Sequence, residues 1–559
     1  MQKDKGMRVN SGPYSENTLF YLVLLAIVML GAWVRLSQFT LQVLLDDEWH
    51  AIHQLLFKGP KELFLTFGHA DFSIPLALMY WLEQKLFGLS ELGMRWPMMA
   101  AGLLTLLVFP LYVRKYFSWS TTLVFSLLLA VSPMLVLYSK TARPYALTLL
   151  LSYVAMGAFH RFIMAKQTNW KPGFVYAVCA VLGVWLHLVI LPLIVAPFLA
   201  FGLPALIDRD RDRLGRIFYL GVFTLAGLLA VVVPPMLGHP EALGAKLGLQ
   251  TPSLQSYYGT LFVWLGTPST EFMLIGVFFA ALGTGELCRK FPLTTSLLTG
   301  LALTFVSILL TRPAWVNHSV TLARYLLPVI PVLLLAISLG IRRVFEVVIR
   351  NWGHSGKLIS LTAIISALSF MGYQSPLLNM LAKPNSNSLH SVYWFDFRSE
   401  KNQIAHYMDD FSVSPFWQEL ASFPQDTLKI AAGPFSFETY HWDAARWEKI
   451  SQQRVMPAFF TGFCVKRRWG EVPNDRGFRF QNVAYPGEKG DLKRRGFDLL
   501  VYQKPFTQST KDGEIAFGKD TAACGPALRE RFPAPIYEDE QLVVFPVSDR
   551  MKYQINVER

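Results

Sequence analysis

Apolar segments of similar length recur along the first two thirds of this chain, and short polar stretches separate them. Most hold about 18 to 22 residues, and a helix of that length crosses the hydrocarbon core of a bilayer, which is roughly 30 Å thick. We predict eleven membrane-spanning helices, at residues 18–36, 92–113, 121–138, 145–163, 173–185, 188–206, 218–237, 272–287, 293–310, 325–341 and 358–373. The pattern therefore predicts a polytopic α-helical membrane protein.

The composition leads to the same class. Of the 559 residues, 52% are hydrophobic and only 16% are charged, and the mean hydropathy is +0.33. The surface of an ordinary soluble domain cannot accommodate so apolar a chain. The first segment ends in Arg35 and Leu36 and has no small residues for a cleavage site, so we expect a retained anchor and not a signal peptide.

Lysine and arginine residues gather at alternate ends of successive segments. The groups are Lys3, Lys5 and Arg8; Arg114 and Lys115; Arg161, Lys166 and Lys171; Arg209, Arg211, Arg213 and Arg216; Arg289 and Lys290; and Arg342, Arg343, Arg350 and Lys357. Short basic loops stay in the cytoplasm, so we expect a cytoplasmic N-terminus and an extracytoplasmic C-terminal part. The loops and the tail account for most of the net charge of +13, and we infer no nucleic-acid partner.

The first outer loop, residues 37–91, contains a further apolar segment at 74–87. Counting it as a span would place Arg114 and Lys115 outside and invert the loops that follow. We therefore predict a juxtamembrane helix that lies along the outer interface.

Residues 374–559 have the composition of a separate soluble domain, since they are rich in charge and interrupted by proline and glycine. Strands are predicted at 428–435, 499–502 and 541–547, and helices at 399–409 and 444–452. The membrane part is accordingly residues 1–373, and the rest is expected to be a small extracytoplasmic α/β domain.

The four cysteines divide between the two parts of the chain. Cys464 and Cys524 lie in the outer domain, where the compartment is oxidising, so a disulfide between them is expected. Cys179 and Cys288 lie in predicted spans, where we expect them to be packing residues.

The acidic triplet Asp46-Asp47-Glu48 follows closely after the first span. Carboxylates at a lipid–water boundary are costly to desolvate, so their presence there suggests that they take part in a reaction. Acidic residues in the first turn of a helix are an alternative explanation for one or two of them.

Some basic residues lie on the predicted outer side, contrary to the rule that basic loops stay in the cytoplasm. Lys140, Arg143, Arg312 and Arg324 fall at or near outer ends of spans, where topology does not explain them. Because the planar fork of arginine matches phosphate oxygens, this set predicts a site for a lipid-linked phosphate. The alternative is that these side chains reach the headgroups or pair with Asp46, Asp47, Glu48 or Asp71.

Several short stretches between residues 40 and 345 resemble the membrane glycosyltransferases of the GT-C class. They are Asp47-Glu48-Trp49, residues 70–76, Gly88-Leu89-Ser90-Glu91 with Arg95-Trp96-Pro97, Tyr138-Ser139 with residues 142–147, Trp185-Leu186-His187, and residues 323–328. The resemblance is to the bacterial protein-mannosyltransferase-like enzymes and the lipid A aminoarabinose or galacturonic acid transferases.

This resemblance implies an inverting transferase that moves a sugar from a polyprenyl-phosphate donor to a lipid, glycan or protein acceptor at the outer face of a bacterial inner membrane. It implies that Asp47 is the base, with Asp46 and Glu48 orienting it or contacting the sugar. Lys140, Arg143 and Arg324, with Tyr325, would bind the donor phosphate. The candidates for further substrate contacts are Asp71, Tyr145 and His187.

Two departures from the family bear on a metal. Relatives often carry glutamate where this chain has Thr141, and His-Pro-Pro-Leu where it has Ser73-Ile74-Pro75-Leu76. We therefore expect no tightly held divalent cation. Asp47, His69 and Asp71 are the candidate ligands if there is one.

Two other function classes fit parts of the pattern. A flippase or transporter of lipid-linked glycans explains the helices, although such folds show internal repeats and this sequence shows none. A non-enzymatic envelope assembly protein explains the outer domain and leaves the acidic loop without a role. Both alternatives predict that Asp47→Asn is tolerated.

Overall fold

The computed structural model describes residues 13–37, 39–40, 44, 48–68, 72–165, 169–374, 377, 413–434, 447–448, 450–460, 463–465, 477–488, 490–510, 513–517 and 521–548. Asp46, Asp47, His69, Asp71 and the predicted helix at 399–409 lie outside these residues.

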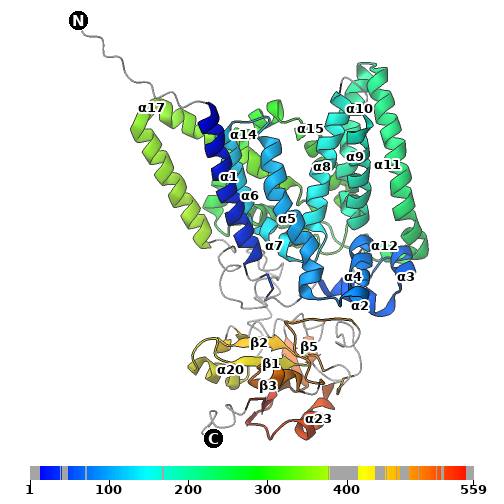
Figure 1. The fold of residues 1–559 in the computed structure, drawn as a ribbon, viewed down its shortest axis with the longest axis vertical. Helices are drawn as coiled ribbons and strands as arrows, with labels where there is room; N and C mark the ends of the chain where they lie inside the picture. Colours follow the sequence, from blue (N-terminus) through cyan, green and yellow to red (C-terminus); the bar gives the residue numbers. More distant parts are fainter. Residues whose placement is uncertain are drawn as a thin grey trace.

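A bundle of long helices makes up the first part of the chain (Figure 1). Its members are α1 (Pro13–Leu36), α5 (Glu91–Val113), α6 (Trp119–Val131), α7 (Pro133–Lys140), α8 (Tyr145–Met164), α9 (Trp170–Leu186), α10 (Leu191–Ile207), α11 (Arg211–Gly238), α14 (Thr270–Lys290), α15 (Thr294–Thr311) and α17 (Val329–Gln374). All eleven predicted segments are therefore helical, although some are broken.

The bundle has the length and polarity of a membrane protein. Among the described residues, seven helices are long and apolar enough to span a bilayer, or up to nine if each bent pair is one span. The exposed surface of these helices is apolar, and only 11% of the apolar window of α11 is buried inside the protein. Helices that are apolar where they are exposed require lipid around them. The chain is thus a polytopic α-helical membrane protein.

Two breaks correct the predicted spans. The segment 121–138 is not one helix, because Pro133 lacks an N–H and starts α7 at 52° to α6. The segment 325–341 does not begin a span at Tyr325, since that residue ends α16 (Ser319–Tyr325), which lies at 88° to α17. A further break, at Gly353, falls between the last two predicted spans, where a φ of 56° interrupts α17.

Short helices cover one end of the bundle. They are α2 (Trp49–Phe57), α3 (Pro60–Leu65) and α4 (Ile74–Leu86) from the first outer loop, with α12 (Pro240–Gly244), α13 (Leu254–Leu265) and α16. Figure 1 shows α2, α3 and α4 between the bundle and the C-terminal sheet. The segment predicted as a juxtamembrane helix is α4, and its 13 residues are too few for a span.

The C-terminal part is built on a five-stranded sheet in the order β2-β1-β3-β7-β6. The strands are β1 (Lys429–Gly433), β2 (Arg454–Pro457), β3 (Leu499–Gln503), β6 (Tyr537–Glu538) and β7 (Leu542–Pro546). The neighbours of β1 run parallel to it, and β7 runs antiparallel to β3. The predicted strands at 428–435, 499–502 and 541–547 are confirmed, whereas β2 was not expected.

Both faces of this sheet are covered. Strand β1 alternates between them, with Ile430 in the core beside Trp417 and Trp447, and Ala431 in the core beside Leu528. Short helices α20 (Pro415–Glu419), α22 (Asp491–Arg494) and α23 (Cys524–Arg531) complete the layers, and β4 (Phe506–Thr510) and β5 (Gly513–Phe517) form a separate hairpin. A disulfide joins Cys464 to Cys524, at the start of α23. This part is an α/β unit, as its strand pattern predicts.

Candidate active site

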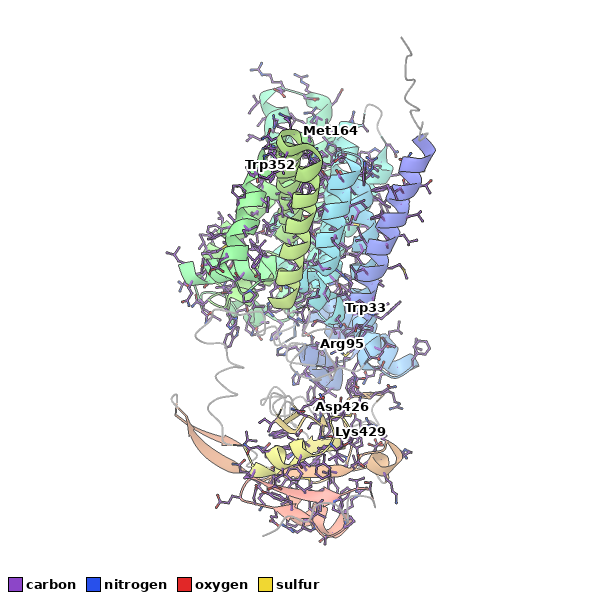
Figure 2. All side chains as sticks on the ribbon, turned by 90° about the vertical axis from the view of Figure 1, so that its left-hand side faces the viewer. Trp33, Arg95, Met164, Trp352, Asp426 and Lys429 are labelled. Atoms are coloured by element: carbon purple, nitrogen blue, oxygen red, sulfur yellow. A yellow bond between two sulfur atoms is a disulfide. The ribbon has the colours of Figure 1, made fainter. Side chains whose placement is uncertain are left out.

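Glu48 and Arg95 form a buried ion pair at the end of the bundle that faces the sheet. Arg95 Nε donates to Glu48 Oε1 at 2.9 Å and Arg95 Nη2 donates to Oε2 at 2.8 Å, so the pair is bidentate. The backbone N–H of Ala142 donates to the same Oε1 at 2.7 Å. Both oxygens of Glu48 are thus engaged, and Figure 2 shows Arg95 at the boundary between the bundle and the lower domain.

Glu48, Arg95 and Ala142 thus form a hydrogen-bonded clamp, which joins three parts of the chain that are distant in sequence. Glu48 precedes α2, Arg95 lies in the first turns of α5, and Ala142 opens the link between α7 and α8. Glu48 was expected among the catalytic acids, and both of its carboxylate oxygens accept hydrogen bonds here. Because Glu48 directly follows Asp46 and Asp47, the clamp fixes the point at which the acidic triplet meets the bundle.

Arg35 and Lys140 are also buried, close to the clamp. Arg35 Nη1 and Nη2 donate to the carbonyl oxygens of Ala130 and Leu129 at the end of α6. Lys140 Nζ donates to the carbonyl oxygen of Ser37, just after α1. Lys140 lies within electrostatic range of both Arg35 and Arg95. The sequence assigned no site role to Arg35, although an arginine near the end of an apolar helix is itself a signal.

Among the described residues, buried basic side chains outnumber buried carboxylates at this place. Arg35, Arg95, Lys140 and Arg143 are buried, and Glu48 and Glu91 are the buried carboxylates that the described residues place at this end of the bundle. The carboxylate of Glu91 already accepts from two backbone N–H groups of the soluble domain. Buried cations need counter-charge. The site is therefore suited to anions, whether its own aspartates or a phosphate.

Rings and a guanidinium from three helix ends meet beside this charge. Arg324 lies 5.9 Å from the ring centroid of Tyr145 and 5.8 Å from that of Tyr325, both distances typical of cation–π contacts. The ring of His187 lies between these two tyrosines, 5.1 Å from Tyr145 and 6.0 Å from Tyr325. Tyr138 extends the row, 4.6 Å from Tyr145. The structure thus brings together Tyr145, His187, Arg324 and Tyr325.

Helix breaks place these side chains. Tyr145 opens α8, and His187 is the extended residue between α9 and the short 3-10 turn that leads into α10. Arg324 and Tyr325 end α16, directly before the 88° bend. Arg312 is not in this row: it is an exposed residue after α15, where its carbonyl oxygen accepts from the N–H of Leu249.

An apolar groove starts at Tyr325. It has a volume of about 170 Å³ and lies between α10, α14, α15 and α17. Leu326, Val329 and Leu193 line it near Tyr325, and Leu287 and Cys288 line it near the far end of α14. The residues that line the groove therefore extend along the membrane helices from Tyr325 to Leu287 and Cys288, and most of them are apolar.

The soluble domain contacts the first outer loop directly. The Oε2 and Oε1 of Glu91 accept from the N–H groups of Gln481 at 3.0 Å and Asn482 at 2.8 Å. Leu89 exchanges two backbone hydrogen bonds of 2.7 Å with Gly477 and Arg479. Trp49, the residue after Glu48, packs edge-on against Phe459 and Phe480, each at 5.6 Å. The loop that carries the acids is thus held between two parts of the protein.

No group of three or more histidine, cysteine or acidic side chains arranged to hold a metal occurs among the described residues. The candidate ligands Asp47, His69 and Asp71 all lie outside them, as does the predicted base. The observed contacts therefore concern the phosphate side of the predicted site and the position of the acidic loop.

Fold and site together define a polytopic helical membrane protein with a cationic site at one end of its bundle and a soluble α/β unit over that end. The fold is similar to two structures of ArnT from Cupriavidus metallidurans. The one bound to undecaprenyl phosphate shares 13% identity over 96% of this chain and 98% of that chain, with a TM-score of 0.44. The apo structure shares 14% identity over 95% and 98%, with a TM-score of 0.45.

A third similar structure is the archaeal oligosaccharyltransferase AglB from Archaeoglobus fulgidus, in complex with an inhibitory peptide and a dolichol-phosphate. It shares 11% identity over 90% of this chain and 74% of that chain, with a TM-score of 0.41. No protein-family model matches the chain, and no curated protein sequence matches it. These likenesses concern the fold and carry no argument about activity.

Proposed function

We propose that this chain is an inverting glycosyltransferase that moves a sugar from a polyprenyl-phosphate donor to a lipid, glycan or protein acceptor. In this proposal it is a multi-pass protein of a bacterial inner membrane, with its N-terminus in the cytoplasm and its C-terminal domain in the periplasm. The observation that carries the proposal is the row of Tyr145, His187, Arg324 and Tyr325 at the head of an apolar groove.

The donor is a phosphate with a long hydrocarbon chain, and the site offers a place for each part. Arg324 and Arg143 are assigned to the phosphate oxygens, because guanidinium groups bind them through two parallel hydrogen bonds. Lys140 adds positive charge from a buried position beside Arg35 and Arg95. The hydrocarbon chain of the donor is assigned to the groove below Tyr325, whose lining is mostly apolar.

The proposed reaction is one displacement at the anomeric carbon. The acceptor oxygen forms a bond to that carbon while the bond from the carbon to the phosphate oxygen breaks, and the leaving polyprenyl phosphate keeps the electron pair. The Asp47 carboxylate takes the proton of the acceptor hydroxyl. Attack from the side opposite to the phosphate inverts the anomeric configuration.

The buried cations have a second role in this step. Negative charge grows on the phosphate as its bond to the sugar breaks, and fixed positive charges nearby lower the energy of that state. A divalent cation performs the same task in many phosphate enzymes. Here Arg143, Arg324 and Lys140 are assigned to it, so we propose that activity does not depend on a tightly bound metal.

The position of Asp47 depends on the residues around it. Glu48 is anchored to Arg95 and Ala142, and Trp49 is anchored to the soluble domain. The carbonyl oxygen of Thr40, on the other side of the triplet, accepts from Asn482 Nδ2 at 2.9 Å. Both flanks of the acidic segment are therefore restrained, as a base that must meet an acceptor hydroxyl requires.

The test is sugar transfer in membranes. Radiolabelled undecaprenyl-phosphate sugars are offered one at a time to membranes with the intact chain, with Asp47→Asn or with Arg324→Ala. The matched controls are Asp208→Asn and Arg289→Ala, exposed residues that precede α11 and end α14. Label should enter a lipid, glycan or protein fraction with the intact chain and both controls only.

If both site variants transfer label as well as the controls, the assigned roles are wrong. If no donor is used by any form, while the intact chain moves a labelled lipid across proteoliposome membranes, the chain is a flippase. Chelation with EDTA is expected to leave the transfer rate unchanged, and a loss restored by a divalent cation would contradict the metal-independent proposal.

A further inference from the structure

A second cavity lies among the membrane helices, away from the proposed reaction site. Its volume is about 360 Å³, and α5, α6, α8, α9, α17 and the link between α14 and α15 form its walls. The wall reaches Pro331 and Val332 in the first turn of α17 and extends to Arg161 and Lys171. Cavities of about 300 Å³ and more hold small ligands.

Arg161 and Lys171 are at the end of the bundle opposite to the soluble domain. Arg161 lies in the last turn of α8, close to Met164, and Lys171 lies in the first turn of α9. Figure 2 shows Met164 at that end of the bundle, as it shows Trp352, and far from Arg95. In the predicted orientation this is the cytoplasmic end. The cavity therefore has two exposed basic residues at the leaflet opposite to that of the proposed reaction.

The mouth of the cavity is basic and its interior is apolar. Arg161 and Lys171 are both exposed, and Lys115 Nζ lies 5.9 Å above the ring of Tyr112, another wall residue. None of the described residues lining the cavity is acidic. The rule that basic loops stay in the cytoplasm explains why Arg161, Lys171 and Lys115 are positively charged. It does not explain an apolar cavity beside them.

The cavity is also open to the side. Val108 of α5 and Val175 of α9 line it and are 39% and 41% exposed, so they face the hydrocarbon region. A hydrocarbon chain can enter between these two helices without leaving the membrane. Gly157 widens the space, because a Cβ there would already contact the Tyr112 ring at 3.7 Å.

We propose that this cavity binds an anionic glycerophospholipid of the surrounding leaflet, with one acyl chain in the cavity and the phosphate held by Arg161 and Lys171. Basic pockets between membrane helices bind the headgroups of anionic lipids in this way. The site is separate from the proposed donor site in headgroup position, but Val332 lines both the cavity and the apolar groove. A bound acyl chain consequently packs against the same helix that borders the groove.

The test uses the purified full chain in phosphatidylcholine nanodiscs and measures the binding of chain-labelled phosphatidylglycerol. The variants are Arg161→Gln, Lys171→Gln and the double variant. The matched control is Arg350→Gln, because Arg350 is exposed on α17 two residues before Trp352, which Figure 2 shows at the same end of the bundle. Each single variant should weaken binding about fivefold and the double variant about thirtyfold, while the control binds as the intact chain does.

Other probes decide the nature of the ligand. Gly157→Leu should abolish binding by filling the cavity, with thermal unfolding measured to show that the variant is folded. Equal binding of the double variant and the intact chain would overturn the proposal. So would equal affinity for labelled phosphatidylcholine, or displacement of the label by inorganic phosphate or glycerol phosphate alone. Tighter binding of a polyprenyl phosphate at this site would show that the occupant has been assigned wrongly.

Discussion

Arg35 Nη2 donates a hydrogen bond of 3.2 Å to the carbonyl oxygen of Leu129. In an unbroken helix that oxygen would accept from the backbone N–H four residues on, but that residue is Pro133, which has none. The next carbonyl, that of Ala130, accepts from Arg35 Nη1 at 2.8 Å. The guanidinium thus occupies the place of hydrogen bonds lost at the break between α6 and α7.

Replacing Arg35 with methionine should destabilise the protein by about 2 to 4 kcal/mol, because two buried carbonyl groups lose a charged donor. Pro133→Ala restores one donor, so it should stabilise the Arg35→Met variant by about 1 kcal/mol more than it stabilises the intact chain. Thermal unfolding of the four forms in one detergent measures this coupling. Additive effects would show that Arg35 does not substitute for the helix bonds.

The Glu48–Arg95 pair gives a different pattern. Arg95→Met leaves a buried carboxylate and should cost about 3 to 5 kcal/mol, and Glu48→Leu leaves a buried guanidinium and should cost a similar amount. The double variant should cost clearly less than the sum. Glu48→Gln is the milder control, because its carbonyl oxygen still accepts from the N–H of Ala142. Asp47→Asn, in contrast, should abolish transfer without lowering the unfolding temperature.

Substitution of Glu91 tests the contact between the outer loop and the soluble domain. Glu91→Gln leaves one carbonyl oxygen for two N–H groups, so the amide of Gln481 or Asn482 should exchange with deuterium about ten to a hundred times faster. The matched control is Glu62→Gln on α3, whose side chain is exposed in the same outer loop. Unchanged protection at both amides in the Glu91 variant would mean that other contacts hold the domain.

Arg324 and Tyr145 test the row at the groove. Arg324→Lys keeps the charge but loses the planar fork, so kcat/KM for the donor should fall about tenfold, and Arg324→Ala should lower it about a hundredfold. Tyr145→Phe keeps the ring under the guanidinium and should have little effect, whereas Tyr145→Leu should resemble Arg324→Lys. Transfer assays over a range of donor concentrations separate these variants. Equal loss in Tyr145→Phe and Tyr145→Leu would shift the role from the ring to the hydroxyl.

The soluble domain should lose stability in acid. Hydrogen bonds from Arg529, and from Lys504 next, lower the pKa of Glu538 below its usual value. A carboxylate whose pKa is lower in the folded state stabilises that state above the unfolded pKa, and the contribution is lost as the pH falls through the folded pKa. Glu538 is 39% exposed, so the effect should be below about 1 kcal/mol and weaker in salt.

Unfolding of the intact chain between pH 7 and pH 3 measures this contribution, with Glu538→Gln as the comparison. The difference between the two forms should vanish at the acid end of the range. A difference that stays constant with pH would show that the ion pair is not its source.

The helical segments could be predicted from the sequence because hydropathy is a local property, and all eleven are helical although two of them contain a bend. The break at Pro133 was accessible too, since proline cannot continue the hydrogen-bond ladder of α6. The partners of Glu48 were not, because Arg95 and Ala142 are 47 and 94 residues away and a local pattern cannot identify them. In the sequence, Arg35 is recognisable only as an arginine near the end of an apolar helix. Its role becomes apparent only from the structure, where it donates to the carbonyl oxygens at the bend between α6 and α7.

The site residues divide in the same way. Tyr145, His187, Arg324 and Tyr325 are charged or aromatic residues at predicted outer helix ends, and the structure places them in one row. Strand β2 was not predicted because Arg454-Val455-Met456-Pro457 is short and ends in proline, and its assignment rests on pairing with β1. Asp46, Asp47, His69 and Asp71 remain predictions from the sequence.

The hydrogen bonds between Leu89 and residues 477–479 also bear on the order in which the parts of the chain become structured during synthesis. Ribosomes make the acidic loop among the first hundred residues and the segment that holds it nearly four hundred residues later. During that interval every membrane helix can insert while the loop still lacks its restraint. Under the proposed function, a newly made chain should therefore stay inactive until its last domain has folded, and chains cut short after α17 should insert in the membrane without using the lipid-linked donor.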